Sequence, residues 1–264
     1  ALEDGSANVI IGPNAGAGVV SGDFNTIVGK QAGAGGDFNQ ASFFGYQAGA
    51  VNTGAGVSGF GSQALLANTS GTDNTALGKG ALQTNTTGIN NTAVGVSALS
   101  GDLVAGNSNS AIGYQAAKNL DGTSDNNNAF GSTALFTAGA RHRNQAFGNA
   151  AGYFLAVGGN DNVLFGHQSG RGLTTADKNT MVGNYSGRST TGSSNVFLGY
   201  YTGYDQVAVS DMLLIDNQDR DNAADELTEA LMVGTFDAAP ANQRLLFNAN
   251  VVSNNYNFAA DAEA

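Results

Sequence analysis

The sequence contains no cysteine and no tryptophan, and its 264 residues include only two prolines and two histidines. The lack of cysteine excludes a disulfide scaffold, a thiolate zinc site and a cysteine nucleophile. Charged residues make up 12% of the chain, about half of the usual ~25%. The net charge of −11 argues against nucleic acid as a partner. Because no apolar run approaches the ~20 residues of a membrane span, we also expect no membrane insertion.

Glycine, in contrast, is abundant, with 39 residues, and a repeat explains it. The repeating unit has an asparagine, one further residue, two apolar residues, a central glycine, two variable residues, a small residue, and then Gly or Leu. The interval between successive central glycines is nearly constant along the chain. They are Gly12, Gly29, Gly45, Gly61, Gly78, Gly95, Gly113, Gly131, Gly148, Gly166, Gly183 and Gly199.

The short period limits the architecture. Helical repeats need about 33 residues or more and propeller blades about 40. The much shorter unit seen here fits one coil of a parallel β-solenoid, which we expect to hold two short strands and two turns. Coils stacked at about 4.8 Å make a rod on the order of 50 Å long. The predicted fold class is therefore all-β, a β-roll of about twelve coils.

Two pairs of positions recur in every unit. The residue before each central glycine is always large and apolar, and the third residue after it is always small. We expect this constant pair to fill the inside of the coil. The neighbours of this pair vary together: Ile10 is followed by Gly16, whereas Ala76 is followed by Leu82. Ten of the twelve neighbouring pairs show such volume compensation, which close packing demands.

Because side chains alternate along a strand, the compensated pairs are expected to lie on the outside of the coil. An exposed apolar stripe of that length is rare on soluble monomers. The sequence therefore predicts a homo-oligomeric rod, with this second face buried between chains. The predicted interface residues are Ile10, Ile27, Phe43, Leu65, Leu82, Leu99, Leu135, Leu164, Met181 and Phe197.

The repeat ends after Gly203, and the charge changes there. Residues 205–264 carry eleven acidic and two basic side chains. Apolar runs at 212–215, 231–236 and 245–251 are separated by turn-rich stretches and predict three strands. We expect three parts: a repeat shaft over 1–204, a C-terminal β-strand module over 205–252 and a flexible tail over 253–264.

The repeat resembles a known set of fibre proteins. Segments 74–82, 91–99 and 109–117 share the form Asn-x-Ala-apolar-Gly-x-x-Ala, which is similar to repeats of bacteriophage tail fibres and of the heads of trimeric autotransporter adhesins. Ala41 and Val57 depart from it by replacing the leading asparagine. The resemblance implies a left-handed parallel β-roll, a homotrimer with three chains side by side, and a location on a virion or at the cell surface outside the cell.

Candidate receptor contacts are a basic turn and exposed aromatic residues, which could contact a cell-surface glycan or protein. They are Arg141, His142 and Arg143, and Tyr153, Phe154, Tyr200 and Tyr201. A solvated loop and simple packing, respectively, are the favoured alternatives for these two sets.

Metal and cofactor sites find little support in the sequence. Asp216, Asp219 and Asp221 lie in an acidic cluster, but the EF-hand spacing is absent, so a solvated turn is favoured over a cation site. The GxGxxG at 54–59 belongs to the glycine repeat and not to a strand–helix unit, so we expect no dinucleotide cofactor.

These observations favour a non-enzymatic structural protein, the trimeric shaft of a phage tail fibre that presents or forms a receptor-binding surface. Three alternatives stay open. They are a cellular trimeric surface adhesin, a fibre of a contractile injection system and a polysaccharide depolymerase tailspike.

Overall fold

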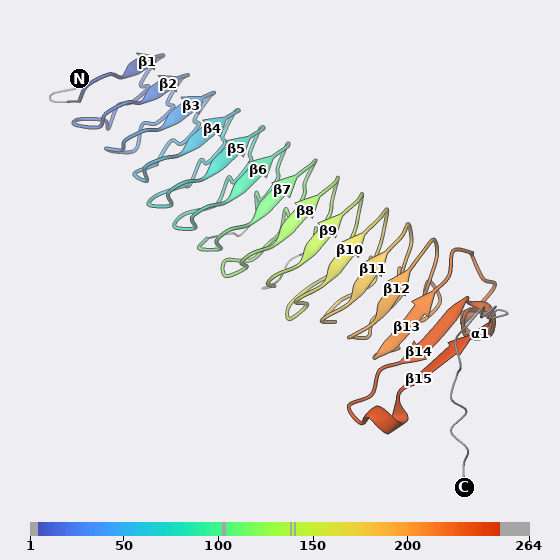
Figure 1. The fold of residues 1–264 in the computed structure, drawn as a ribbon. Helices are drawn as coiled ribbons and strands as arrows, with labels where there is room; N and C mark the ends of the chain where they lie inside the picture. The colour runs from blue at the N-terminus through green and yellow to red at the C-terminus, as the bar shows by residue number, and fades with distance from the viewer. Residues whose placement is uncertain (1–4, 102–103, 138, 140, 249–264) are drawn as a thin grey trace, which may run out of the picture.

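The computed structural model describes residues 5–101, 104–137, 139 and 141–248, which form a long rod of stacked coils (Figure 1). The predicted all-β parallel solenoid of about twelve coils is confirmed. Each coil contributes one strand of three residues. These strands are β1 (Val9–Ile11), β2 (Thr26–Val28), β3 (Ser42–Phe44), β4 (Ser58–Phe60), β5 (Thr75–Leu77), β6 (Thr92–Val94), β7 (Ser110–Ile112), β8 (Asn128–Phe130), β9 (Gln145–Phe147), β10 (Val163–Phe165), β11 (Thr180–Val182) and β12 (Val196–Leu198).

The strands lie side by side in chain order and are parallel, so equivalent residues of successive units stand in columns along the rod. Ala76 of β5, for example, is in register with Gly59 of β4 and Ala93 of β6. Backbone hydrogen bonds join each coil to the next, as from Gly78 N–H to the Phe60 carbonyl at 2.8 Å. Any property that recurs at one position of the repeat therefore becomes a continuous stripe on the rod.

The expectation of two strands per coil is wrong for these twelve coils, within the described residues. After the central glycine the chain forms a tight turn in which residues other than glycine adopt positive φ, such as Gln63 at 60° and Leu65 at 53°. Left-handed residues at alternate positions prevent a second extended segment from forming there.

Two constraints require glycine at the centre of each unit. Gly78 has a φ of 139°, which residues with a Cβ rarely adopt. A Cβ at this position would also lie 2.5 Å from the carbonyl oxygen of Gly95 in the next coil. Close stacking of the coils thus explains why this residue is glycine in all twelve units.

The compensated pairs are in contact, but they lie inside the coil and not outside it. A Cβ on Gly16 would meet Ile10 Cδ1 at 2.8 Å, and one on Gly170 would meet Leu164 Cδ2 at 2.6 Å. Nine of the ten predicted interface residues are fully buried within a single chain, and only Ile10, in the first coil, is partly exposed. The nine are Ile27, Phe43, Leu65, Leu82, Leu99, Leu135, Leu164, Met181 and Phe197. Their assignment to an interchain face is wrong.

On each strand the inward-facing residue is the second before the central glycine, as Ala76 shows, and not the one directly before it. The small residue three positions after the glycine and its neighbour are both buried, as Ala81 and Leu82 show, because the turn bends both inward. Strand alternation does not apply across such a turn. A packed interior tolerates a larger side chain at one position when a smaller one stands at the position that it contacts. Two positions whose side-chain sizes vary in opposite directions therefore indicate the core.

Buried asparagines stabilise the coils on the inside of the turn before most of the strands, and from Asn74 to Asn195 they form an unbroken column. Asn91 Nδ2 donates to the Gly106 carbonyl at 2.8 Å, and Asn91 Oδ1 accepts from the backbone N–H of Asn109 at 3.0 Å. The same pattern repeats along the column through Asn195. The leading asparagine of the repeat therefore links successive coils, beyond forming its own turn.

The sheet continues past the repeats. β13 (Met212–Ile215) pairs parallel with β12, and β14 (Met232–Thr235) and β15 (Arg244–Phe247) follow in antiparallel order. The three strands lie where the apolar runs predicted them, with the third ending at 247; residues 249–264, with the expected tail, lie outside the described residues. A short helix α1 (Ala223–Glu229) and a 3-10 turn (Pro240–Asn242) lie between these strands and were not expected. In the part of the chain that the structure describes, no helix has the length and apolar character to cross a membrane.

Candidate interaction surfaces

The outward side of the strands carries an apolar stripe along the whole rod, which we call the outer stripe. It consists of the large residue before each central glycine: Ile11, Val28, Phe44, Phe60, Leu77, Val94, Ile112, Phe130, Phe147, Phe165, Val182 and Leu198. The exposed fraction is 51% at Leu77 and 57% at Phe165. The large member of the constant pair thus faces outward, the reverse of what the sequence led us to expect, whereas the small member is buried inside the coil as expected, as at Ala64 and Ala81.

Register makes the outer stripe continuous. Ile11 pairs with Val28, and the chain of partners continues to Leu198 and then to Ile215 of β13. The rings of Phe44 and Phe60 stack in parallel with their centroids 4.9 Å apart, and those of Phe130 and Phe147 are 4.8 Å apart. The stacking covers ring faces within the stripe and leaves its outer surface apolar.

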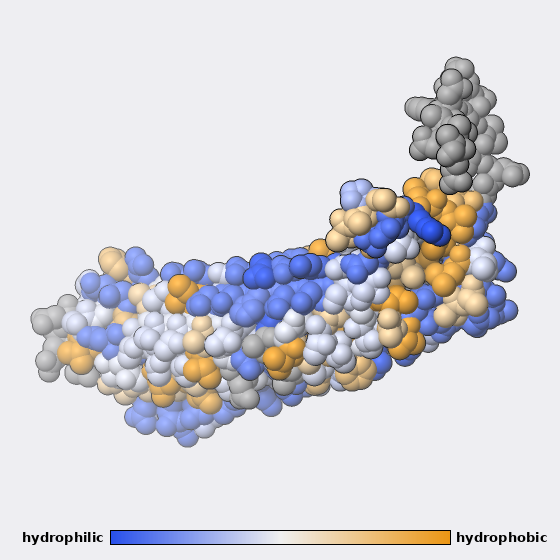
Figure 2. Space-filling view, turned by 90° about the horizontal axis from the view of Figure 1, so that it is seen from below, coloured by the Kyte–Doolittle hydropathy of each residue, from blue (hydrophilic) through white to orange (hydrophobic). Residues whose placement is uncertain are grey.

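Further apolar side chains gather at the C-terminal end of the rod (Figure 2). Leu245, Leu246 and Phe247 of β15 are about half exposed, as are Leu231 and Phe236. In the view of Figure 2 the shaft itself is mostly hydrophilic or neutral, with scattered apolar residues.

The three residues of the basic turn that was predicted as a receptor contact lie in three different environments. Arg141 is fully buried and donates to the carbonyls of Leu135 and Leu155, so its assignment as a receptor contact is wrong. Burial lowers the pKa of Arg141 to about 9. Arg143 is exposed and forms a bidentate pair with Asp161, at 2.6 and 2.9 Å. His142 is partly exposed beside Asp125.

The aromatic candidates lie on the surface of the last coils. Phe154 and Tyr200 are 40% and 44% exposed, and Tyr153 and Tyr201 are partly exposed. They do not fill the space beside Gly152, because the side chains of Leu135 and Leu164 from the neighbouring coils occupy it. The structure places them in two groups three coils apart, one after Gly148 and the other after Gly199.

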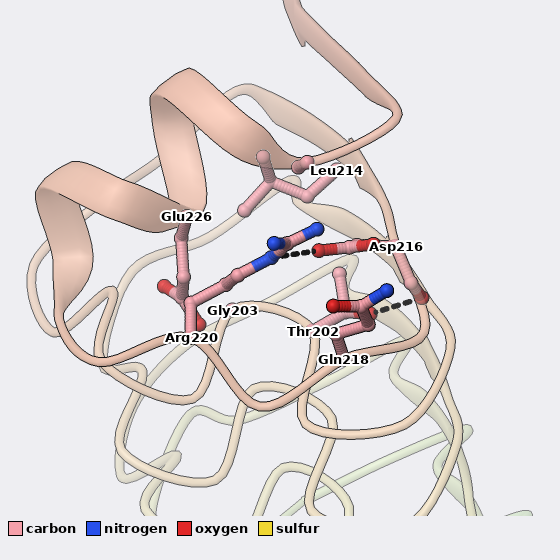
Figure 3. A pocket seen from close by; sticks show the side chains of 8 residues that line it. Thr202, Gly203, Leu214, Asp216, Gln218, Arg220 and Glu226 are labelled. Atoms are coloured by element: carbon pink, nitrogen blue, oxygen red, sulfur yellow. Dashed lines mark hydrogen bonds and ion pairs between the residues drawn. The ribbon is translucent and has the colours of Figure 1, made fainter. Parts of the chain in front are cut away.

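A small pocket lies between the last coil and α1 (Figure 3). Arg220 extends across it to pair with Asp216 at 2.6 Å and with Glu229 at 2.9 Å. Glu226 of α1 is only 4% exposed. One of its carboxyl oxygens accepts from Asp205 N–H at 3.4 Å, and the other has no partner. Burial raises the pKa of Glu226 to about 7.

The acidic cluster does not form a common site. Asp216 pairs with Arg220, while Asp219 and Asp221 are exposed. Within residues 5–101, 104–137, 139 and 141–248, no three acidic or histidine side chains converge in a way that could hold a metal ion.

Comparison with protein families, curated proteins and solved structures finds no match to this chain.

Proposed function

We propose that the protein is the structural shaft of an extracellular fibre, in which three copies of the chain pack side by side as left-handed β-rolls. The observation that carries this proposal is the outer stripe. Twelve large apolar residues in register form one exposed column along the rod, and several are about half exposed. Soluble proteins rarely leave such a surface in water.

The period of the outer stripe favours further copies of the same chain as its cover. Its side chains recur once per coil, at about 4.8 Å. A partner must present apolar groups at that spacing over twelve coils, and a second copy does so by construction. Closed symmetric assemblies are the usual form of homo-oligomers. Three chains, as in the fibres that the repeat resembles, would bury their stripes around a common axis.

The function of such an assembly is mechanical and multivalent. A stiff rod holds a binding surface away from its point of attachment, and three equal copies raise the avidity of any contact. By resemblance of the repeat, the favoured setting is a phage tail fibre on the virion, with a cell-surface adhesin as the alternative.

Replacement of Phe165 by aspartate tests the interface. Phe165 is 57% exposed in the single chain, so the fold should tolerate Phe165→Asp. If a phenylalanine offers about 200 Å², roughly 110 Å² per chain is available for burial, or about 3 kcal/mol at 25 cal/mol per Å². We expect wild-type particles of about 80 kDa, three chains, and weakened assembly in the variant, measured by mass photometry across a dilution series.

The matched control is Val157→Asp, nine residues after a central glycine and 63% exposed, half a coil away from the strand. It should assemble like the wild type. A wild-type chain that stays at its single-chain mass, or equal effects of the two substitutions, would contradict the proposal. Circular dichroism of both variants verifies that the coils remain folded.

A further inference from the structure

A second column of side chains, on the turn after each strand, is built from cations and aromatic rings. It occupies the fifth position after the central glycine in the last six coils, and we call it the cation–aromatic ladder. Its members are Lys118, Phe136, Tyr153, Arg171, Arg188 and Tyr204. Each coil contributes one member, at the same position of the repeat. At about 4.8 Å per coil the ladder spans roughly 24 Å.

Several neighbouring members of the ladder contact one another. The ring of Phe136 stacks on that of Tyr153 with centroids 5.0 Å apart. The guanidinium of Arg171 lies 5.3 Å from the Tyr153 ring centre and 4.6 Å from that of Phe154. The two rings are nearly perpendicular to each other, at 83°, so the guanidinium contacts both without lying flat on both. Contact with two rings restricts its position, and its N–H groups are the donors that arginine uses to bind carboxylates.

The next two rungs differ from this arrangement, because Arg188 contacts one ring and its Nε donates to Gln168 Oε1 at 2.7 Å. Arg188 lies 5.4 Å from the ring centre of Tyr204 and donates to its hydroxyl at 3.0 Å. Tyr204 stacks on Tyr201 with centroids 4.9 Å apart, and Tyr201 contacts Tyr200 and Tyr185. The ladder thus ends in a group of partly exposed tyrosines.

The charge of this region has the opposite sign to that of the protein. Residues 118–204, which contain the ladder, carry six basic and four acidic side chains, a net charge of +2 within a chain of −11. Among the described residues the ion pairs involve His142, Arg143 and Arg220, and neither Arg171 nor Arg188 has a carboxylate partner. The equivalent positions of the first three coils are Ala17, Ala34 and Ala50, so the coil itself does not require large side chains there.

We propose that the cation–aromatic ladder binds an acidic polysaccharide, with Arg171 and Arg188 contacting its carboxylates and the aromatic rings packing against its sugar faces. An extended polyanion matches the linear ladder, the two arginines without acidic partners and the local positive charge. Aromatic residues and arginine also dominate binding surfaces in general. The inference deepens the proposed function and rests on it only in that three chains would present three ladders.

Binding of hyaluronan oligosaccharides, which carry carboxylates as their only charged groups, tests the proposal. Affinity is measured by calorimetry at fixed salt, with neutral dextran oligosaccharides as the comparison. We expect wild-type protein to bind hyaluronan and not dextran, and the double variant Arg171→Gln/Arg188→Gln to bind at least tenfold more weakly. Phe154→Ser, which retains all charges, should weaken binding at least threefold.

The matched control removes two charges elsewhere on the shaft, Lys30→Gln/Lys79→Gln, at exposed positions of earlier coils. It should stay within twofold of the wild type. Three results would overturn the proposal: no binding of hyaluronan, equal losses in both double variants, or a change of assembly mass in the arginine variant, which would place the ladder between chains. Since assembly mass tests the shaft independently, failure of glycan binding alone leaves the proposed function standing.

Discussion

Moving volume from one member of a compensated pair to the other should largely restore the stability that each single change removes. The sixth coil contains Ala93 and Leu99, both fully buried. The tenth coil contains the opposite arrangement, Leu164 with Gly170, at the same two positions. The double variant Ala93→Leu/Leu99→Gly therefore gives the sixth coil a pair that the rod already accommodates.

The single changes are expected to be costly for different reasons. Leu99→Gly removes a buried side chain and leaves a cavity, which costs about 2–5 kcal/mol in well-packed cores. Part of this is offset, because Leu99 has a φ of 48° that glycine adopts without strain. Ala93→Leu adds three carbon atoms to a filled interior, which typically costs about 1–3 kcal/mol.

The assay is denaturant unfolding of all four proteins at one concentration, followed by circular dichroism. We expect the double variant to lie within about 1.5 kcal/mol of the wild type, a coupling of roughly 2–3 kcal/mol between the two positions. Additive losses would show that the two side chains do not share one space, and would refute the placement of the pairs inside the coil.

Three other changes test buried polar groups. The pKa of Glu226 is about 7 in the folded chain, whereas its ordinary value is 4.5, so the free energy of unfolding should fall as pH rises from about 4.5 to 7. The expected fall is roughly 3 kcal/mol, and Glu226→Gln should remove most of it. Unfolding curves of both proteins at pH 4 and pH 8 measure the difference. Asn91→Ala leaves the Asn109 N–H and the Gly106 carbonyl without their buried partner, and should lower the free energy of unfolding by about 3 kcal/mol; no change in the denaturant midpoint would exclude a stabilising asparagine column. Arg141→Met replaces a buried guanidinium whose Nε has no partner, so stability should stay the same or rise by up to about 2 kcal/mol; a loss above about 3 kcal/mol would show that its hydrogen bonds outweigh the cost of burying the charge.

The repeat made the coil number and the parallel stacking predictable, because a glycine at a near-constant interval fixes both the turn and the approach of the next coil. Volume compensation between positions such as Phe43 and Gly49 was also visible in the sequence. The inward-facing side of the coil was not predictable from the sequence. Leu65 and Leu82 lie in a turn, have positive φ and are buried, and the alternation of side chains along a strand does not describe such a turn.

The candidate surfaces show the same limit. Arg141 looks like a surface cation in the sequence, and only the structure reveals that its side chain turns into the coil to reach two backbone carbonyls. The cation–aromatic ladder has a signal in the sequence, since Arg171 and Arg188 occupy the same repeat position as Tyr153 and Tyr204. The contacts between these cations and rings follow only from the structure.

The central claim is that other copies of the chain cover the outer stripe. A cryo-electron microscopy cross-section of the assembled rod tests it most directly. The account predicts three coils around a common axis, with strands β1 to β12 of each chain facing inward and Leu77 and Phe165 next to that axis. A rod with a single coil in cross-section, or three coils whose strands face the solvent, would contradict it.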